Sequence, residues 1–241
     1  MPRSTRILLL DGPEGRMAEL AGRMRELGYS VLRAKTPEEA LVLLENPAWS
    51  VRAVVVPPDP PVADLPGALR ALRERSRDPL VFLVEGPRPD DAGRDALREA
   101  GVALALYTPY DDAVLRFQMN RALDAEAPGP RRRGRRVPCG AAATVAVGGR
   151  VKDARVYSLG PHGAFLETAR PTLRRARVEL GIPRVLGEVM LPAQVVSTNV
   201  PGNLSRRNLP HGMAVEFEAV PADAAEALER YLWEREQALA I

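Results

Sequence analysis

The chain has 241 residues, of which 46% are hydrophobic and 27% are charged, and its formal net charge is +3 at pH 7. These values are typical of a globular protein with one or two domains, each large enough to bury its own core. No apolar run approaches the length of a membrane-spanning helix, and the run at residues 7–10 is too short for a signal peptide, so we expect a cytoplasmic protein without membrane insertion.

Residues 4–123 alternate between short apolar runs and segments in which apolar residues recur at helical spacing. The apolar runs end at turn residues and predict buried strands, whereas the spaced segments predict helices. Strands are expected at residues 5–10, 29–34, 51–56, 80–84 and 102–107. Helices are expected at residues 14–27, 36–46, 65–75, 90–100 and 111–123. This alternation predicts an α/β domain, a doubly wound parallel five-stranded sheet with helices on both faces.

The number and order of these elements resemble the response-regulator receiver domain over residues 4–123. In that family, acids after the first strand hold a divalent metal, and an Asp ending the third strand accepts the phosphoryl group. A Thr or Ser ends the fourth strand, and a Lys-Pro pair ends the fifth. This chain keeps Asp11 but has Pro57, Glu85 and Thr108 at the three later positions. Because phosphoryl transfer needs the cation and its carboxylate ligands, the resemblance implies a receiver-like domain over residues 1–123 that is not phosphorylated.

A proline-rich segment at residues 57–61 follows the third predicted strand. A bulge at Pro57 and Pro58 would bring Asp59 to the phosphoacceptor position, which leaves phosphorylation open as an alternative. The stiffness of consecutive prolines favours instead a rigid loop that contacts another protein or a second copy of the chain. The exposed faces of the fourth and fifth helices likewise leave a homodimer open.

The segment 124–130, Asp-Ala-Glu-Ala-Pro-Gly-Pro, has the composition of a domain boundary, and we place a linker at residues 124–136. Beyond it, apolar runs between turn residues predict strands at residues 144–147, 150–157, 163–167, 177–180, 185–197 and 213–217. A final helix is expected from Pro221 onwards, with Trp233 off an apolar stripe made by Ala224, Leu228, Tyr231 and Leu232. Six short strands predict an all-β domain over residues 137–241, a small antiparallel barrel with a terminal helix.

Three motifs stand out in this half of the chain. The segment from Arg132 to Arg136 has the form Arg-x-x-x-Arg, residues 158–163 are Ser-Leu-Gly-Pro-His-Gly, and residues 211–217 are His-Gly-Met-Ala-Val-Glu-Phe. They resemble the Arg-x-x-x-Arg segment, the Asp/Asn-x-Ser-x-x-Gly motif and the late glycine-containing strand of the PilZ domain, the bacterial receptor module for cyclic di-GMP. The order and spacing of these motifs, with the terminal helix, extend the resemblance over residues 131–232.

The resemblance implies six residues for a cyclic di-GMP site: Arg132, Arg133, Arg136, Ser158, Gly160 and Gly163. In the family, the arginines bind phosphates and stack on guanine, while the acid or amide and the serine of the second motif bind the guanine edge. Here Ser158 stands at the acidic position and Gly160 at the serine position, so both guanine contacts are weakened. Each lost contact is expected to lower the affinity about tenfold, so the sequence predicts that binding is weak or lost.

The arginine cluster at residues 131–136 also permits a nucleic-acid patch. The aromatic share of 5% provides few stacking partners for bases, so nucleic acid is not expected as a partner. No acidic partner is suggested for His162 or His211, and the single Cys139 excludes a multi-cysteine metal site, so neither catalysis nor a cofactor is expected. The sequence predicts a non-enzymatic signalling protein that acts on signalling or motility proteins. It does so either as a cyclic di-GMP effector or as a ligand-independent scaffold.

Overall fold

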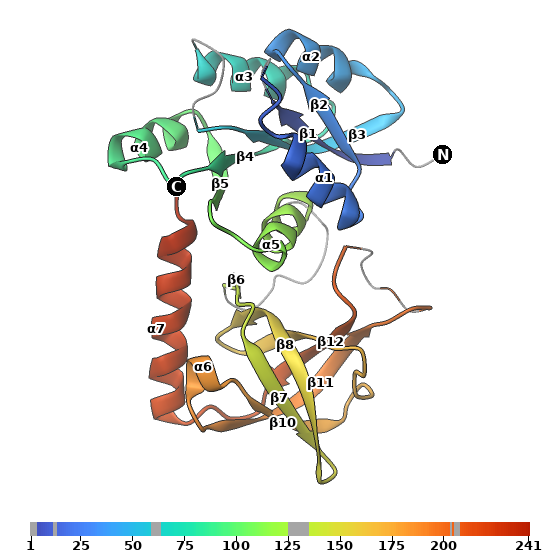
Figure 1. Cartoon of the computed structure of the whole chain (residues 1–241), viewed down its shortest axis with the longest axis vertical. Helices are drawn as coiled ribbons and strands as arrows, with labels where there is room; N and C mark the ends of the chain where they lie inside the picture. Colours follow the sequence, from blue (N-terminus) through green and yellow to red (C-terminus); the bar gives the residue numbers. More distant parts are fainter. Residues whose placement is uncertain (1–3, 12–13, 59–63, 125–134, 203, 205–207) are drawn as a thin grey trace. The chain divides into compact units, whose positions relative to one another are not determined.

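The computed structural model describes residues 4–11, 14–58, 64–124, 135–202, 204 and 208–241. These residues divide into two compact units, drawn from Met1–Pro128 with Leu239–Ile241 and from Gly129–Ala238 (Figure 1). We refer to them as the N-terminal unit and the barrel unit. The predicted linker at residues 124–136 falls almost entirely outside the described residues and stays a prediction.

The N-terminal unit contains a parallel sheet of five strands in the order β2-β1-β3-β4-β5. The strands are β1 (Ser4–Leu10), β2 (Val31–Ala34), β3 (Trp49–Val56), β4 (Val81–Gly86) and β5 (Val102–Tyr107). Alternate residues of β1 enter different cores, Ile7 and Leu9 on one face and Leu8 and Leu10 on the other. Burial on both faces explains why the strands appear in the sequence as continuous apolar runs. The predicted doubly wound α/β sheet is confirmed, with the 2-1-3-4-5 strand order of flavodoxin-like folds.

Five helices cover the two faces of this sheet. They are α1 (Ala18–Glu26), α2 (Pro37–Glu45), α3 (Leu65–Arg75), α4 (Asp91–Glu99) and α5 (Asp112–Leu123). Apolar side chains of α1 and α5 belong to one core cluster, and those of α2, α3 and α4 belong to the other. Thr36 caps α2, since its Oγ1 accepts the amide hydrogen of Glu39 at 3.2 Å.

The predicted start of the first helix at residue 14 is wrong, because α1 begins at Ala18. Gly15 has a φ of 68°, in the left-handed region that interrupts a helix. The amide of Met17 donates to the Oδ1 atom of Asp11 at 2.5 Å. A carboxylate from the end of β1 therefore accepts the amide hydrogen at the start of α1. Among the described residues, no side chain adjacent to the helix caps it.

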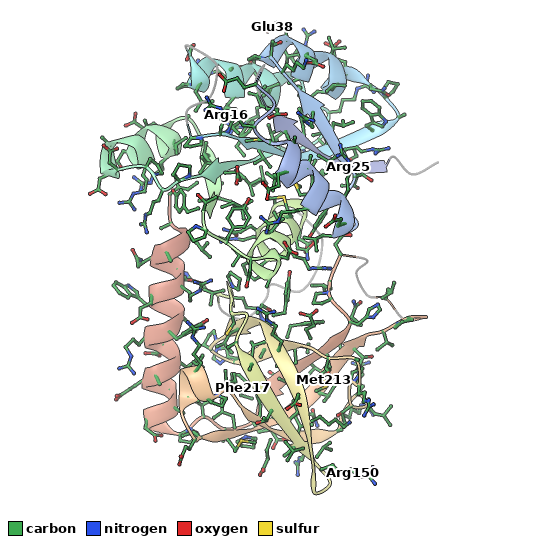
Figure 2. All side chains as sticks on the ribbon, viewed as in Figure 1. Arg16, Arg25, Glu38, Arg150, Met213 and Phe217 are labelled. Atoms are coloured by element: carbon green, nitrogen blue, oxygen red, sulfur yellow. The ribbon has the colours of Figure 1, made fainter. Side chains whose placement is uncertain are left out.

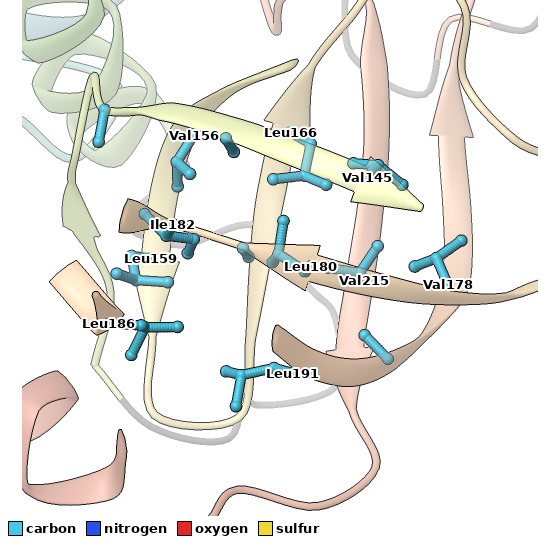
Figure 3. Close-up of a cluster of buried hydrophobic side chains, with 14 of the residues drawn as sticks. Val145, Val156, Leu159, Leu166, Val178, Leu180, Ile182, Leu186, Leu191 and Val215 are labelled. Carbon is cyan, nitrogen blue, oxygen red and sulfur yellow. The ribbon is translucent and has the colours of Figure 1, made fainter. Parts of the chain in front are cut away.

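The barrel unit is a closed ring of six antiparallel strands, in the order β8-β7-β10-β11-β12-β9 and back to β8. They are β7 (Ala142–Val147), β8 (Arg150–Gly160), β9 (Gly163–Glu167), β10 (Arg177–Gly181), β11 (Met190–Asn199) and β12 (Gly212–Phe217). Apolar side chains from every strand fill the interior (Figure 3). Figure 2 labels Arg150 at the tip of the β7–β8 hairpin and Met213 and Phe217 on β12. The predicted barrel is confirmed, and closure leaves the ring without a free edge.

Two features of this unit depart from the prediction. Residues 185–197 are not one strand, since Pro183–Leu186 forms the short helix α6 and β11 begins at Met190. Pro183 is suited to a first helical position, and Gly187, with a φ of 61°, ends the turn. A further strand, β6 (Val137–Pro138), was not predicted and pairs with the end of β8.

The chain ends in α7 (Ala222–Leu239), as the apolar stripe predicted. Ala224 and Leu228 are buried in the barrel core, with Tyr231 and Leu232 packed against it. Trp233, placed off the stripe by the sequence, is 62% exposed. Among the helices of the described residues, none is long and apolar enough to cross a membrane.

Candidate ligand-binding site

The candidate site lies where the chain enters the barrel. β6 pairs antiparallel with β8, with Val137 opposite Leu159 and Pro138 opposite Ser158. This pairing places Arg136, which directly precedes β6, beside the second motif. Arg132 and Arg133 lie outside the described residues, so their part in the site stays a prediction.

Three of the predicted residues contact one another. The Nη1 atom of Arg136 donates to the Oγ atom of Ser158 at 3.5 Å, and Ser158 is only 4% exposed. A Cβ atom added at Gly160 would lie 2.9 Å from the carbonyl oxygen of Arg135 and 3.0 Å from the Cγ atom of Arg136. The missing side chain at Gly160 therefore lets the arginine segment pack directly on β8.

Gly163 occupies a different position, at the start of β9. It pairs with Gly160 on β8 and with Glu216 on β12. A Cβ atom at Gly163 would lie 2.2 Å from the carbonyl oxygen of Val215, and one at Gly212 would lie 1.9 Å from that of Leu166. Since Gly163 does not adopt a left-handed φ, the glycine is required by the close approach of β9 and β12.

Three side chains of α7 also contact the entry segment, and sequence reasoning missed them. The hydroxyl of Tyr231 donates towards Cys139, 3.2 Å from its Sγ atom and 3.4 Å from its carbonyl oxygen. The Nε atom of Arg235 donates to the carbonyl oxygen of Pro138 at 3.3 Å, and Arg135 pairs with Glu236 at 3.1 Å. The only sequence signal was the helical spacing that puts Tyr231 and Arg235 one turn apart.

The arrangement of Arg136, Ser158 and Gly160 suits a phosphate group better than a guanine base. The guanidinium of Arg136 has several donors in one plane, which is the geometry that phosphate oxygens accept. At the two aligned motif positions, the hydroxyl of Ser158 is the sole side-chain polar group, since Gly160 has none. His162, which lies between Gly160 and Gly163, is exposed. These residues therefore provide hydrogen-bond donors for a phosphate group, without the carboxylate that would bind a guanine edge.

The position in the N-terminal unit that corresponds to the acidic site of a receiver is occupied by Asp11, which is 4% exposed. The Oδ2 atom of Asp11 accepts from the Nε atom of Arg33 at 2.7 Å and also from Nη2. Among the described residues, no three acidic, His or Cys side chains are grouped as a metal would require. The donor set does not fit a divalent cation, and Arg33 supplies the positive charge beside Asp11. Asp59 lies outside the described residues.

Glu85 and Tyr110 form a half-buried pair in the same unit, with the hydroxyl of Tyr110 donating to the Oε1 atom of Glu85 at 2.7 Å. Burial raises the pKa of Glu85, opposed by the Tyr110 hydrogen bond and by the charge of Arg23. A raised folded-state pKa means that folding favours the protonated form. The contribution of Glu85 to the stability of the folded protein is therefore fully present below the pKa that Glu85 has in the unfolded chain. It is lost as the pH rises through the pKa that Glu85 has in the folded protein.

We therefore expect Glu85→Gln to stabilise the N-terminal unit more at pH 7.5 than at pH 4.5, because glutamine stays neutral and retains an acceptor for Tyr110. Urea midpoints of the wild-type protein and the variant at both values measure this difference. Asp78→Asn, in the same unit, is the control for the loss of a carboxylate without this pairing. An equal effect of Glu85→Gln at both pH values would contradict the raised pKa.

Residues 130–234 match the family model described as PilZ domain. No curated protein sequence matches the chain. Among solved structures, the chemotaxis protein CheY4 of Vibrio cholerae is 15% identical, with 51% of this chain and 100% of that chain covered and a TM-score of 0.41. The receiver domain of the sensor histidine kinase PA1611 from Pseudomonas aeruginosa, with a bound magnesium ion, is 21% identical over 49% and 96%, with a TM-score of 0.42.

A third solved structure, the PlzA protein of Borreliella burgdorferi in complex with c-di-GMP, is 12% identical, with 48% of this chain and 47% of that chain covered and a TM-score of 0.34. The assignment of the second half depends on the family model, the motif order and the closed barrel. The assignment of the first half depends on its strand order. Residues 130–234 match the PilZ domain family and fold as a closed antiparallel barrel, and the unit that precedes them has the receiver topology.

Proposed function

We propose that this chain is a non-enzymatic signalling protein whose PilZ domain binds cyclic di-GMP weakly and transmits binding to a protein partner. The observation that carries this proposal is the packing of Arg136 over Ser158 and Gly160 at the entrance of the barrel. An arginine on the segment that enters the barrel, packed on a strand that has glycine at position 160, would provide the anion-binding half of a PilZ site.

Weak binding follows from the groups that the site lacks. A hydroxyl at Ser158 can accept fewer guanine donors than a carboxylate, and Gly160 offers no side chain. Two missing contacts of roughly 1–2 kcal/mol each would lower the affinity about a hundredfold relative to a site that has both. The ligand is therefore expected to bind in the micromolar range or more weakly.

The receiver-like unit is proposed to act by contact with a signalling or motility protein. Its one remaining acid at the end of β1, Asp11, is paired with Arg33, and Pro57 stands at the position of the phosphoacceptor. Because of both features, the charge at the end of β1 is not expected to change by metal binding or phosphorylation. A unit of this kind suits docking to a partner better than switching by phosphorylation.

Calorimetric titration of cyclic di-GMP into the full-length protein tests the ligand. Restoring the acidic residue with Ser158→Asp is expected to tighten binding about tenfold, and Arg136→Ala to weaken it about tenfold. Arg150→Ala, which removes an exposed arginine from the β7–β8 hairpin, is the matched control and should leave binding unchanged. Gly160→Ser is expected to be less effective than Ser158→Asp, because its Cβ atom meets the Arg135 carbonyl oxygen at 2.9 Å.

The alternative is a ligand-independent scaffold. It is favoured by the same two departures from the family motif, Ser158 at the acidic position and Gly160 at the serine position. The titration separates the two functions. No heat and no thermal shift at millimolar ligand, in the wild-type protein and in Ser158→Asp, would refute the effector and leave the scaffold.

A further inference from the structure

The entry segment Arg135–Cys139 carries Arg136 and has little support from the sheet itself. β6 has two residues and stands at the end of the strand order, so it pairs with β8 alone. Its ladder is followed by two backbone bonds, from the amides of Cys139 and Gly140 to the carbonyl oxygens of Tyr157 and Val156, at 3.2 and 2.7 Å. A strand this short does not hold its position by pairing alone.

We propose that helix α7 holds this segment in place, and that ligand binding at Arg136 and the attachment of α7 to the barrel are therefore energetically coupled. The part that concerns the ligand rests on the proposed function, whereas the holding contacts do not. Three α7 side chains contact three residues of the segment: Tyr231 contacts Cys139, Arg235 contacts Pro138, and Glu236 pairs with Arg135.

The three contacts differ in strength. Arg135 is 86% exposed, so its ion pair with Glu236 contributes little. The bonds from Tyr231 and Arg235 are partly buried, and both end on atoms of the entry segment that lie close to β8. Burial and the hydrogen bond to Cys139 raise the pKa of Tyr231, so its hydroxyl remains a donor at neutral pH. The Tyr231 and Arg235 bonds are therefore the ones expected to hold the segment.

The coupling follows from the position of Arg136. In this structure its side chain lies over Ser158 and Gly160. The residues that follow it are held by β8 at Val137 and Pro138 and by α7 at Pro138 and Cys139. A phosphate-bearing ligand that draws Arg136 away from Ser158 must shift Arg135–Cys139 and weaken the bonds to α7. By linkage, weakening those bonds must favour ligand binding by the same factor.

Amide hydrogen exchange of the ligand-free full-length protein tests the holding contacts directly. The reporters are the amides of Cys139 and Gly140. In Tyr231→Phe and in Arg235→Ala these amides should exchange roughly two- to tenfold faster than in the wild-type protein, which is the range for one lost hydrogen bond. Arg230→Ala makes the same chemical change on an exposed residue of the same helix and should leave exchange unaltered. Amides of β10 and β11 monitor whether the barrel stays folded.

Two outcomes overturn the inference. The first is equal exchange at Cys139 and Gly140 in all variants while β10 and β11 stay protected. The second appears with cyclic di-GMP: binding heat without faster exchange in residues 231–236 of the wild-type protein would show that ligand and helix are uncoupled. An absence of binding heat refutes the proposed function instead, and the ligand-free exchange still decides whether α7 holds the segment.

Discussion

Replacement of Gly163 by alanine is expected to lower the free energy of unfolding of the barrel unit by about 3 kcal/mol. The added Cβ atom would lie 2.2 Å from the carbonyl oxygen of Val215 and 3.3 Å from the Cα atom of Glu216. Both belong to the backbone of β12, which cannot withdraw without breaking its ladder with β9. No rotamer change relieves such a contact, so the strands must separate.

Urea unfolding of the full-length chain in a Trp49→Phe background measures this effect, because Trp233 on α7 then reports on the barrel unit. Gly148→Ala is the matched control. Gly148 lies between β7 and β8 with a φ of 53° and no atom within 4 Å of an added Cβ, so only the left-handed conformation opposes alanine there, by about 1–2 kcal/mol. A Gly163→Ala protein as stable as Gly148→Ala would contradict the steric role.

This prediction also bears on the ligand motif. Gly163 pairs with Gly160, and that pairing fixes the end of β8 on which Ser158 lies. Loss of affinity in a Gly163 variant would therefore follow from a displaced strand, without any contact between the glycine and the ligand. The motif would then combine residues proposed to contact the ligand with one that the barrel itself requires.

The sequence predicted those elements whose signal is local. Helix 65–75 and strands 102–107 and 163–167 have the predicted bounds, because apolar periodicity and flanking turn residues define them. The start of α1 depends on a bond from Met17 to Asp11 across a glycine turn, and α6 is a single turn too short for periodicity. Neither could be inferred from propensity.

Of the six residues proposed from the motifs, the structure brings Arg136, Ser158 and Gly160 together through the pairing of β6 with β8. The motifs did not predict the contacts that place them there. The steric role of Gly163 depends on β12, and the bond from Tyr231 to Cys139 joins residues 92 positions apart. Such contacts depend on strand closure and helix docking, which no local pattern encodes.

Replacement of Arg33 by methionine is expected to destabilise the N-terminal unit by about 2 kcal/mol, because it leaves the carboxylate of Asp11 buried without a compensating charge. The Asp11 side chain is 1% exposed, and within the described part of the chain its other bond is from the amide of Met17. The figure is below that for a fully buried pair since the Arg33 side chain is 36% exposed. Urea unfolding of Arg75→Met, which removes the exposed pair with Glu45, should differ little from wild type.

A double-variant cycle separates charge compensation from packing. Asn at position 11 retains an acceptor for the Met17 amide without the charge, so Asp11→Asn should offset most of the loss caused by Arg33→Met. If the double variant is no more stable than Arg33→Met alone, the loss arises from packing of the Arg33 side chain. If it recovers, Arg33 is a permanent internal counter-charge for Asp11. The end of β1 would then keep one charge state, which favours the proposed docking role over phosphorylation.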